Sequence, residues 1–250
     1  MSDGQDAAAR AYQARRARQR ASFWFRRFYP DYISEDQVFD QMLAAQIGAG
    51  ALIVDAGCGS GEISRPDYTR ARAVIGIDRD AELAANTQVT WRAQSDLESI
   101  PLAAECADVV VCKYVIEHLA SPPAVFREFA RVLRPGGCVV AHTPNTRHYV
   151  QFAARLIPQQ FHFGLVRALC GRASFPKYRR ANTPPRLIQA MQAAGLECER
   201  MTYFESAPDY FQNVPLLYPL GVAYERWVNA SPRRAEWRLN LIGVFRKPAR

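Results

Sequence analysis

The stretch Val54-Asp55-Ala56-Gly57-Cys58-Gly59-Ser60-Gly61 decides the fold of this 250-residue chain. It follows the apolar run 51–54, a predicted strand, and places three glycines at alternate positions behind an acidic residue. Glycine has no Cβ, so the backbone there can approach a ligand closely or take a positive φ. The acidic residue favours a ligand with a positively charged end, although a tight strand-to-helix turn without a ligand would use glycines in the same way.

Two common phosphate-binding loops do not match this stretch. A P-loop needs Lys and then Ser or Thr after its last glycine, whereas Gly61 is followed by Glu62 and Ile63. The dinucleotide fingerprint G-x-G-x-x-G needs glycine at position 62 or 64, which Glu62 and Ser64 occupy. The loop therefore belongs to neither class.

Four further apolar runs follow, at residues 73–77, 89–91, 107–112 and 138–141. The run at 107–112 is apolar almost throughout, as is typical of a strand buried on both faces of a parallel sheet. A helix is predicted from Ser121 as N-cap until the sequence Arg-Pro-Gly-Gly at 134–137 ends it. Alternating strands and helices predict an α/β fold with a doubly wound sheet and a ligand at the carboxyl ends of its strands.

Five motifs, in order, resemble those of the class I S-adenosylmethionine-dependent methyltransferases, and most closely their small-molecule, ubiquinone-biosynthesis branch. They are residues 54–61, Gly76-Ile77-Asp78, Asp96-Leu97, Glu117-His118-Leu119 and Leu133-Arg134-Pro135-Gly136-Gly137. The resemblance is close over about 30–145 and follows only element order over 180–247. It implies a Rossmann-like, seven-stranded, mostly parallel sheet with an antiparallel edge hairpin, and S-adenosyl-L-methionine as cofactor.

The resemblance also implies which residues hold the cofactor. Asp55, Gly57 and Gly59 would surround its methionine part. Cys58, in the same loop, is also a candidate cofactor-binding residue, and Lys113 would line the same end. At the other end, the contacts would come from strand-end residues: Asp78 to the ribose hydroxyls, Arg79 along the adenine, Asp96 to the adenine amino group and Leu97 through its backbone. The alternatives are a solubilising role for Asp78 and an ordinary cap or turn role for Asp96.

One departure from the family pattern follows the glycine-rich loop. Pro66 comes barely one turn after Gly61, so the first helix is expected to be short or irregular. Arg65 or Tyr68 then becomes a candidate for the wall of the site.

Methyl transfer needs alignment of two reactants and, for a hydroxyl acceptor, removal of a proton. The face of Tyr114 would stabilise a sulfonium charge. His118 is the candidate general base because imidazole titrates near neutral pH, and His142 is a second candidate. A purely structural role for the Glu117-His118 pair is the alternative.

Two segments outside the cofactor motifs, residues 1–30 and about 146–182, are rich in basic and aromatic residues. Residues 1–30 are predicted to form a basic helical arm, which either folds over the cofactor pocket, lies on an anionic membrane or contacts nucleic acid. The methyltransferase domain is expected at 31–250, with a lid or substrate insertion at about 146–182. The apolar, prolyl segment 214–222 either packs in the core or presents a surface to a lipid-linked acceptor.

Composition is consistent with a single catalytic domain. The formal net charge is +8, and no charge-free apolar stretch is long enough to span a bilayer. The six cysteines form no C-x-x-C pair, which favours thiols in a reducing compartment over disulfides or a metal site. With no apolar signal core, we expect a cytoplasmic protein, with contact to a membrane surface left open.

We therefore expect an S-adenosylmethionine-dependent enzyme that O-methylates a small-molecule, sugar or lipid-linked acceptor. Base N-methyltransferases carry an Asn- or Asp-Pro-Pro-aromatic motif where this chain has Cys112-Lys113-Tyr114-Val115, so nucleic acid is a disfavoured partner. Two alternatives stay open: an RNA or protein methyltransferase that uses the basic surface, and a cofactor-binding interaction subunit without catalysis.

Overall fold

A computed structural model describes residues 23–61, 66–156, 176–208, 211 and 217–249. The chain divides into two compact units. We call residues 36–145, 177–202 and 241–250 the sheet unit, and residues 1–35, 146–176 and 203–240 the helical unit. The predicted arm at 1–30 and the predicted insertion at 146–182 remain predictions, since residues 1–22 and 157–175 lie outside the described residues.

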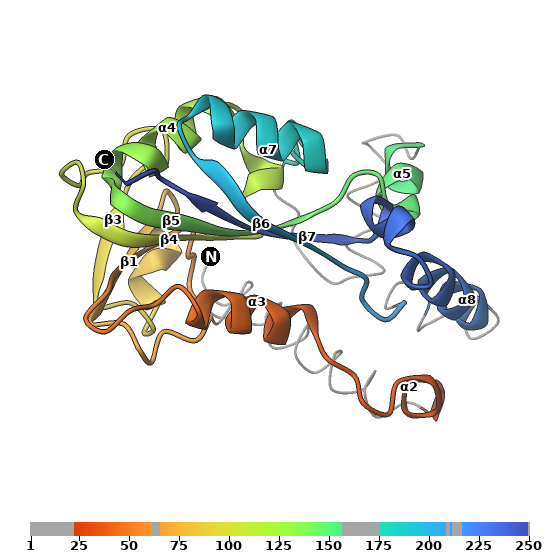
Figure 1. The fold of residues 1–250 in the computed structure, drawn as a ribbon. Coiled ribbons are helices and arrows are strands. Elements are labelled where there is room, and N and C mark those ends of the chain that lie inside the picture. Colours follow the sequence, from red (N-terminus) through yellow and green to blue (C-terminus); the bar gives the residue numbers. More distant parts are fainter. Residues whose placement is uncertain (1–22, 62–65, 157–175, 209–210, 212–216, 250) are drawn as a thin grey trace. The chain divides into compact units, whose positions relative to one another are not determined.

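The sheet has the predicted doubly wound, seven-stranded arrangement (Figure 1). Its strands in chain order are β1 Leu52–Ala56, β2 Ala73–Asp78, β3 Trp91–Gln94, β4 Ala107–Lys113, β5 Leu133–Pro144, β6 Glu197–Phe204 and β7 Asn240–Arg246. In space the order is β3-β2-β1-β4-β5-β7-β6, with β1 to β5 parallel and an antiparallel pair at the β6 edge. The order reverses between β1 and β4, which is where ligands bind in sheets of this kind.

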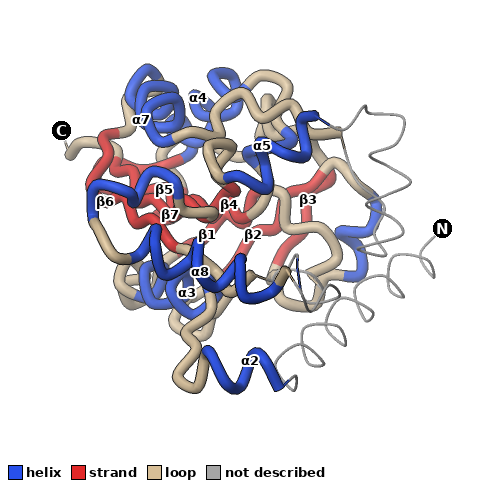
Figure 2. Tube along the Cα trace, turned by 90° about the vertical axis from the view of Figure 1, so that its right-hand side faces the viewer, coloured by secondary structure: helices blue, strands red, loops and turns tan. Residues whose placement is uncertain are grey.

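Helices cover both faces of this sheet (Figure 2). The α-helices α4, Pro122–Val132, and α7, Pro184–Ala193, lie on one face, and α3, Glu35–Ala44, lies on the other. Two short 3-10 helices, η1 at Ala81–Ala85 and η2 at Ile116–His118, follow β2 and β4. The helical unit holds α2, Phe23–Phe28, α5, Tyr149–Leu156, α8, Tyr218–Asn229, and the 3-10 helix η4, Pro232–Trp237. No helix among the described residues is long and apolar enough to cross a bilayer.

The core of the sheet unit forms where the sequence pattern predicts it. β4 is buried along nearly its whole length, and α4 buries Val125, Phe126, Phe129 and Val132 against the strands. These positions recur every three or four residues, so one stripe of α4 faces the sheet. Burial of the stripe fixes α4 on one face of the sheet.

One boundary differs from the prediction. Residues 134–137 were expected to end a helix before a strand at 138–141, yet β5 begins directly after α4, at Leu133. Ala107 pairs with Leu133 and Val109 with Cys138, so two steps along β4 match five along β5 and the extra residues bulge. The bulge is held by Lys247, whose backbone bonds Gly136 and Gly137 at 3.0 and 2.8 Å. The glycines therefore accommodate a third segment of chain, a contact that local sequence does not reveal.

The segment 206–238, left without predicted elements, contains α8 and η4. Residues 214–216 of the apolar segment 214–222 lie outside the described residues. In the described part, Tyr218, Gly221 and Val222 are buried while Leu217 and Leu220 are exposed. Part of the segment thus packs in the core, while a role of the exposed part toward a lipid-linked acceptor stays a prediction.

Two glycines at positive φ permit a test of backbone strain against packing. Gly57, directly after β1, has φ +76°, and a Cβ there would lie 2.4 Å from Val115 Cγ2. Gly136 has φ +80°, but a Cβ there would meet no atom within 4 Å. Alanine at either position costs about 1–2 kcal/mol of backbone strain. We expect Gly57→Ala to lose about 1–3 kcal/mol more from overpacking. Urea unfolding measures both variants, and equal losses would contradict the close contact at Gly57.

Candidate active site

Asp78 links the ends of three neighbouring strands. One carboxylate oxygen accepts a hydrogen bond from the backbone N–H of Gly59 at 2.8 Å, and the other accepts from Asp80 at 2.9 Å. The Asp78 carbonyl accepts from the N–H of Ser95, after β3, at 3.0 Å. The carboxylate is therefore fixed in orientation but stays partly exposed, with lone pairs left to accept from ligand hydroxyls.

The side chain of Asn86 holds the glycine-rich loop through hydrogen bonds. This side chain is buried, and its amide nitrogen donates to the carbonyls of Cys58 and Gly59 at 3.3 and 3.1 Å. Its oxygen accepts from the N–H of Gln88 at 2.9 Å. Nothing in the sequence singles out Asn86, because its role depends on a contact across 27 or 28 residues of chain.

Asp55, at the end of β1, is a buried carboxyl with a perturbed pKa. Burial raises its pKa to about 6, and the neighbouring Asp78 adds to the rise, whereas Tyr68 and Lys113 oppose it. A cation bound near such a buried carboxyl would stabilise its ionised form. The predicted position of Asp55 in the site is thus accompanied by an electrostatic environment suited to a positive ligand.

Tyr68, predicted as a wall residue, reaches Asp55. Its hydroxyl is buried and lies close enough to lower the pKa of Asp55, yet it makes no hydrogen bond of standard geometry within the described residues. Burial and the Asp55 charge raise the pKa of Tyr68 well above its usual range, so it stays protonated as a donor. The chain at 66–68 is not helical, as Pro66 predicts, while Arg65 lies outside the described residues.

Lys113 ends β4 as a buried cation. Its Nζ lies 2.9 Å from Asp36 Oδ1 and 4.8 Å from the centre of the Phe39 ring, both on α3. Its charge also lowers the pKa of Asp55. A buried ammonium needs such a partner. The ion pair with Asp36 was not predicted, because the two residues are far apart in sequence.

The remaining cofactor candidates lie at the same strand ends. Cys58 is half-buried, and burial raises the pKa of its thiol above the usual range, with Asp55 and Asp78 adding to the rise. Arg79 is exposed, and its carbonyl accepts from the Gln94 side chain at 3.0 Å. Asp96 is exposed and caps a turn by accepting from the N–H of Glu98 at 2.9 Å, while the Leu97 side chain is buried. Asp96 thus has the turn role that was its alternative, and its exposed carboxylate retains further acceptor capacity.

Tyr114, after β4, has a left-handed backbone conformation that residues other than glycine rarely adopt, with φ +59°. Its N–H donates to the carbonyl of His142 at 2.8 Å, and its ring centre lies 4.4 Å from that of His142. His142 is fully buried and also stacks on Phe39 at 5.8 Å. Strained backbone of this kind clusters at functional sites. The geometry favours Tyr114 as a site residue over His142 as an accessible base.

His118 lies next to a buried carboxylate. Its Nε2 is 4.0 Å from Glu117 Oε1, and its side chain is about a quarter exposed (24%). The other Glu117 oxygen accepts from the Thr143 hydroxyl at 3.2 Å, and the Glu117 carbonyl accepts from the N–H of Arg179 at 3.1 Å. Glu117 therefore anchors η2 and leaves His118 at the surface beside it.

A second histidine–carboxylate pair lies in the helical unit and was not predicted. His148 Nε2 is 3.2 Å from Glu205 Oε1, and both side chains are buried. The N–H of Val150 donates to His148 Nδ1 at 3.3 Å, so Nε2 carries the proton that Glu205 accepts. Both ring nitrogens are engaged, which gives His148 a structural role. The described residues contain no group of three or more His, Cys, Asp or Glu arranged to hold a metal ion.

Comparisons with known proteins point to a methyltransferase. Residues 54–141 match the family model described as a methyltransferase domain. The ubiquinone biosynthesis O-methyltransferase of Xanthomonas axonopodis pv. citri is 25% identical over 217 residues, which covers 80% of this chain and 77% of that protein. A protein of Mycolicibacterium smegmatis named "Probable S-adenosylmethionine-dependent methyltransferase" is 36% identical over 128 residues, covering 50% of this chain and 46% of that one.

A solved structure shares the fold. It is the geranyl diphosphate C-methyltransferase of Streptomyces coelicolor A3(2), in complex with Mg²⁺, geranyl diphosphate and S-adenosyl-L-homocysteine. Its TM-score is 0.53 at 14% identity, covering 84% of this chain and 77% of that one. The sheet order, the family match and the named relatives all support a class I S-adenosylmethionine-dependent methyltransferase.

Proposed function

We propose that this enzyme O-methylates a small-molecule, sugar or lipid-linked acceptor. The observation that carries the proposal is the similarity, over 80% of the chain, to a relative named as an O-methyltransferase of ubiquinone biosynthesis. The sequence at 112–115, which lacks the motif of base N-methyltransferases, also supports a hydroxyl acceptor.

We propose that the carboxyl ends of β1, β2 and β3 hold the cofactor. Asp55, Gly57, Cys58 and Gly59 would face its methionine end, together with Lys113. The adenosine end would be held by Asp78, Arg79, Asp96 and Leu97. The residues fit such a ligand, since Asp55 is a buried carboxyl that a cation would stabilise and Asp78 is an oriented acceptor for hydroxyls. The bound cofactor supplies a methyl group on a positively charged sulfur.

The protein would contribute alignment and proton removal. Tyr114 would present its ring to the positive charge, as its constrained backbone suits a fixed orientation. His118 would accept the acceptor's proton, and the buried Glu117 beside it would favour the protonated imidazolium that results. Contact with a membrane surface would bring a lipid-linked acceptor to the enzyme.

We expect Asp78→Ala to weaken the affinity for S-adenosylmethionine by about 100-fold, because two hydroxyl-to-carboxylate bonds are lost together with the support of the Gly59 loop. Isothermal titration calorimetry measures the affinity. Glu98→Ala removes an exposed carboxylate next to Leu97, at the same proposed adenosine end, and serves as the control. Wild-type affinity in Asp78→Ala would refute the proposed adenosine end.

We expect cofactor affinity to fall as the pH is lowered through about 6, because protonated Asp55 no longer attracts a cation. Between about pH 7 and pH 5 the loss should be about tenfold, as one carboxyl with this pKa is progressively neutralised. Asp55→Asn should bind weakly with little dependence on pH, and His118→Ala should retain the wild-type pH profile. If the pH dependence instead disappears in His118→Ala, the titrating group is His118 and the role proposed for Asp55 is contradicted.

We expect the methyl group of labelled S-adenosylmethionine to appear in the small-molecule or organic-phase fraction of a cell extract treated with the purified enzyme. Label confined to RNA or to protein would instead support the alternative based on the basic surface. In the same assay, His118→Ala should lower turnover at least about 100-fold while cofactor affinity is unchanged. Turnover within a few-fold of wild type would remove His118 as the base.

A further inference from the structure

The helical unit exposes most of the large apolar side chains that the described residues leave in solvent. Of nine such side chains, Trp91 and Tyr178 belong to the sheet unit. The other seven lie in the helical unit: Phe23, Ile33, Phe152, Leu217, Leu220, Trp227 and Trp237. Isolated exposed apolar residues are ordinary, whereas their concentration in one unit indicates an interaction surface.

Helix α8 is apolar on two sides. Tyr218, Gly221 and Val222 are buried, and Gly221 packs so closely that an added Cβ would lie 2.4 Å from Pro208 Cβ. Leu220 and Trp227 lie on the outer side, seven residues apart and therefore on one stripe, with exposed fractions of 64% and 48%. Packing of the unit does not require this second stripe.

The 3-10 helix η4 extends the outer stripe and adds charge to it. Arg234 lies over the Trp227 ring, with Cζ 4.6 Å from its centre, and its Nη1 donates to the Trp227 carbonyl at 2.8 Å. Tyr224 of α8 donates to the carbonyl of Trp237 at 2.8 Å, and Trp237 is 51% exposed. Two exposed tryptophans are thus held on adjoining, mutually bonded elements.

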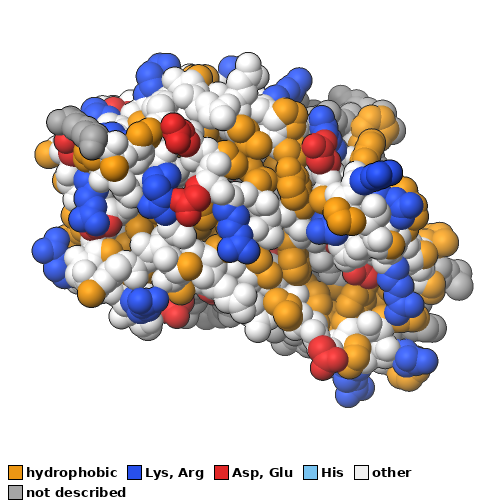
Figure 3. Space-filling model, in the orientation of Figure 1, with side chains coloured by type: hydrophobic (Ala, Val, Ile, Leu, Met, Phe, Trp, Pro, Cys, Tyr) orange, Lys and Arg blue, Asp and Glu red, His pale blue; other side chains and the backbone are white. Residues whose placement is uncertain are grey.

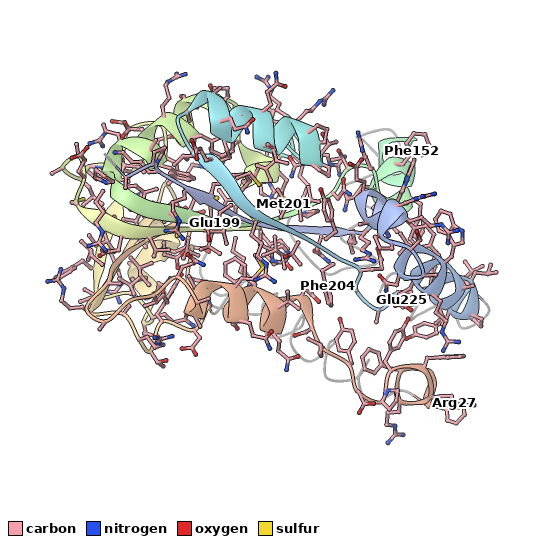
Figure 4. The ribbon with its side chains drawn as sticks, viewed as in Figure 1. Arg27, Phe152, Glu199, Met201, Phe204 and Glu225 are labelled. Atoms are coloured by element: carbon pink, nitrogen blue, oxygen red, sulfur yellow. The ribbon has the colours of Figure 1, made fainter. Side chains whose placement is uncertain are left out.

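Helix α2 contributes further arginines beside α8. The Tyr29 hydroxyl donates to Glu225 at 3.4 Å, and Arg226 lies 5.4 Å from the centre of the Phe28 ring, so the two helices are in contact (Figure 4). The arginines of α2 and the outward arginines of α8 and η4 include Arg26, Arg27, Arg226 and Arg233, all exposed. In Figure 3, basic and hydrophobic side chains adjoin over α2 and α8.

Acidic groups on these elements are mostly engaged. Glu225 is half-buried and bonded to Tyr29 and Asn229, and Glu236 is paired with Arg147. The exposed charge of the surface is therefore predominantly positive. Tryptophan and leucine next to arginine match the boundary of an anionic bilayer, where apolar groups enter the headgroup layer and guanidinium groups meet phosphates.

We propose that α2, α8 and η4 form a surface that binds a bilayer containing anionic lipid. We call it the arginine–tryptophan surface, made of Arg26, Arg27, Leu220, Arg226, Trp227, Arg233, Arg234 and Trp237. An exposed leucine on the same stripe as a tryptophan favours lipid over nucleic acid, whose backbone gives an aliphatic side chain nothing to enter. The inference goes beyond methyl transfer, because binding to vesicles requires neither cofactor nor acceptor.

The test is sedimentation of the full chain with phosphatidylcholine vesicles, with and without phosphatidylglycerol, at low and high salt. We expect binding to the anionic vesicles to be at least about tenfold tighter, and to weaken with salt. Trp227→Ala/Trp237→Ala should lose about tenfold or more in affinity, as should Arg226→Glu/Arg233→Glu. The matched controls are Trp91→Ala and Arg186→Glu/Arg200→Glu, which change exposed residues of the sheet unit and should bind as wild type.

Three results would overturn the proposal. The first is vesicle binding that both double variants retain. The second is retention of the chain by RNA with no binding to anionic vesicles. The third is a dimer in solution that Trp227→Ala/Trp237→Ala dissociates, again without vesicle binding. Because cofactor affinity is measured separately, none of these results bears on the proposed methyl transfer.

Discussion

The hydrogen bond from the Gly59 N–H to the Asp78 carboxylate is the contact on which the candidate site depends. It ties the loop after β1 to the end of β2, while the same residue accepts from Ser95 after β3 through its carbonyl. One aspartate thus sets the relative positions of three loops. Each of these bonds uses a backbone donor, so the side chain of Asp78 is the one side chain that takes part in them.

The burial of Asp55 lowers the stability of the folded protein, and binding of a positively charged ligand would recover that free energy. Asp55 is buried beside another carboxylate, Asp78. Among the described residues, Lys113 is the cation that acts on it, and Lys113 is also paired with Asp36. Burial without full neutralisation costs free energy in the folded protein. A positively charged ligand removes that cost. The raised pKa of Asp55 is therefore consistent with our proposal that this end of the site binds the positively charged part of the cofactor.

The parts of this structure that the sequence predicts are those determined by local patterns. β1, β2 and β4 are apolar runs, and α4 has a helical stripe. Asp55 and Asp78 lie at the carboxyl ends of β1 and β2, which must meet at one edge of a parallel sheet. Asn86 and the Asp36–Lys113 pair escape prediction because each depends on residues distant in sequence. The glycines at 136 and 137 have a familiar local meaning, a helix stop, and α4 does end at Val132; their inclusion in β5 and their contact with Lys247 are not visible in the local sequence. The roles of the site residues toward cofactor and acceptor rest on family resemblance and on the proposals above.

The division of the chain explains why the acceptor is harder to infer than the cofactor. The cofactor candidates all lie in the sheet unit, where strand pairing constrains them. The helical unit is assembled from three separate segments, 1–35, 146–176 and 203–240, two of which interrupt the sheet unit's chain between β5 and β7. Segments inserted in this way change composition without disturbing the strand ends, because no strand order depends on them. The exposed tryptophans and arginines of these segments can therefore vary without altering the strand ends that carry Asp55 and Asp78, the aspartates that we propose hold the cofactor.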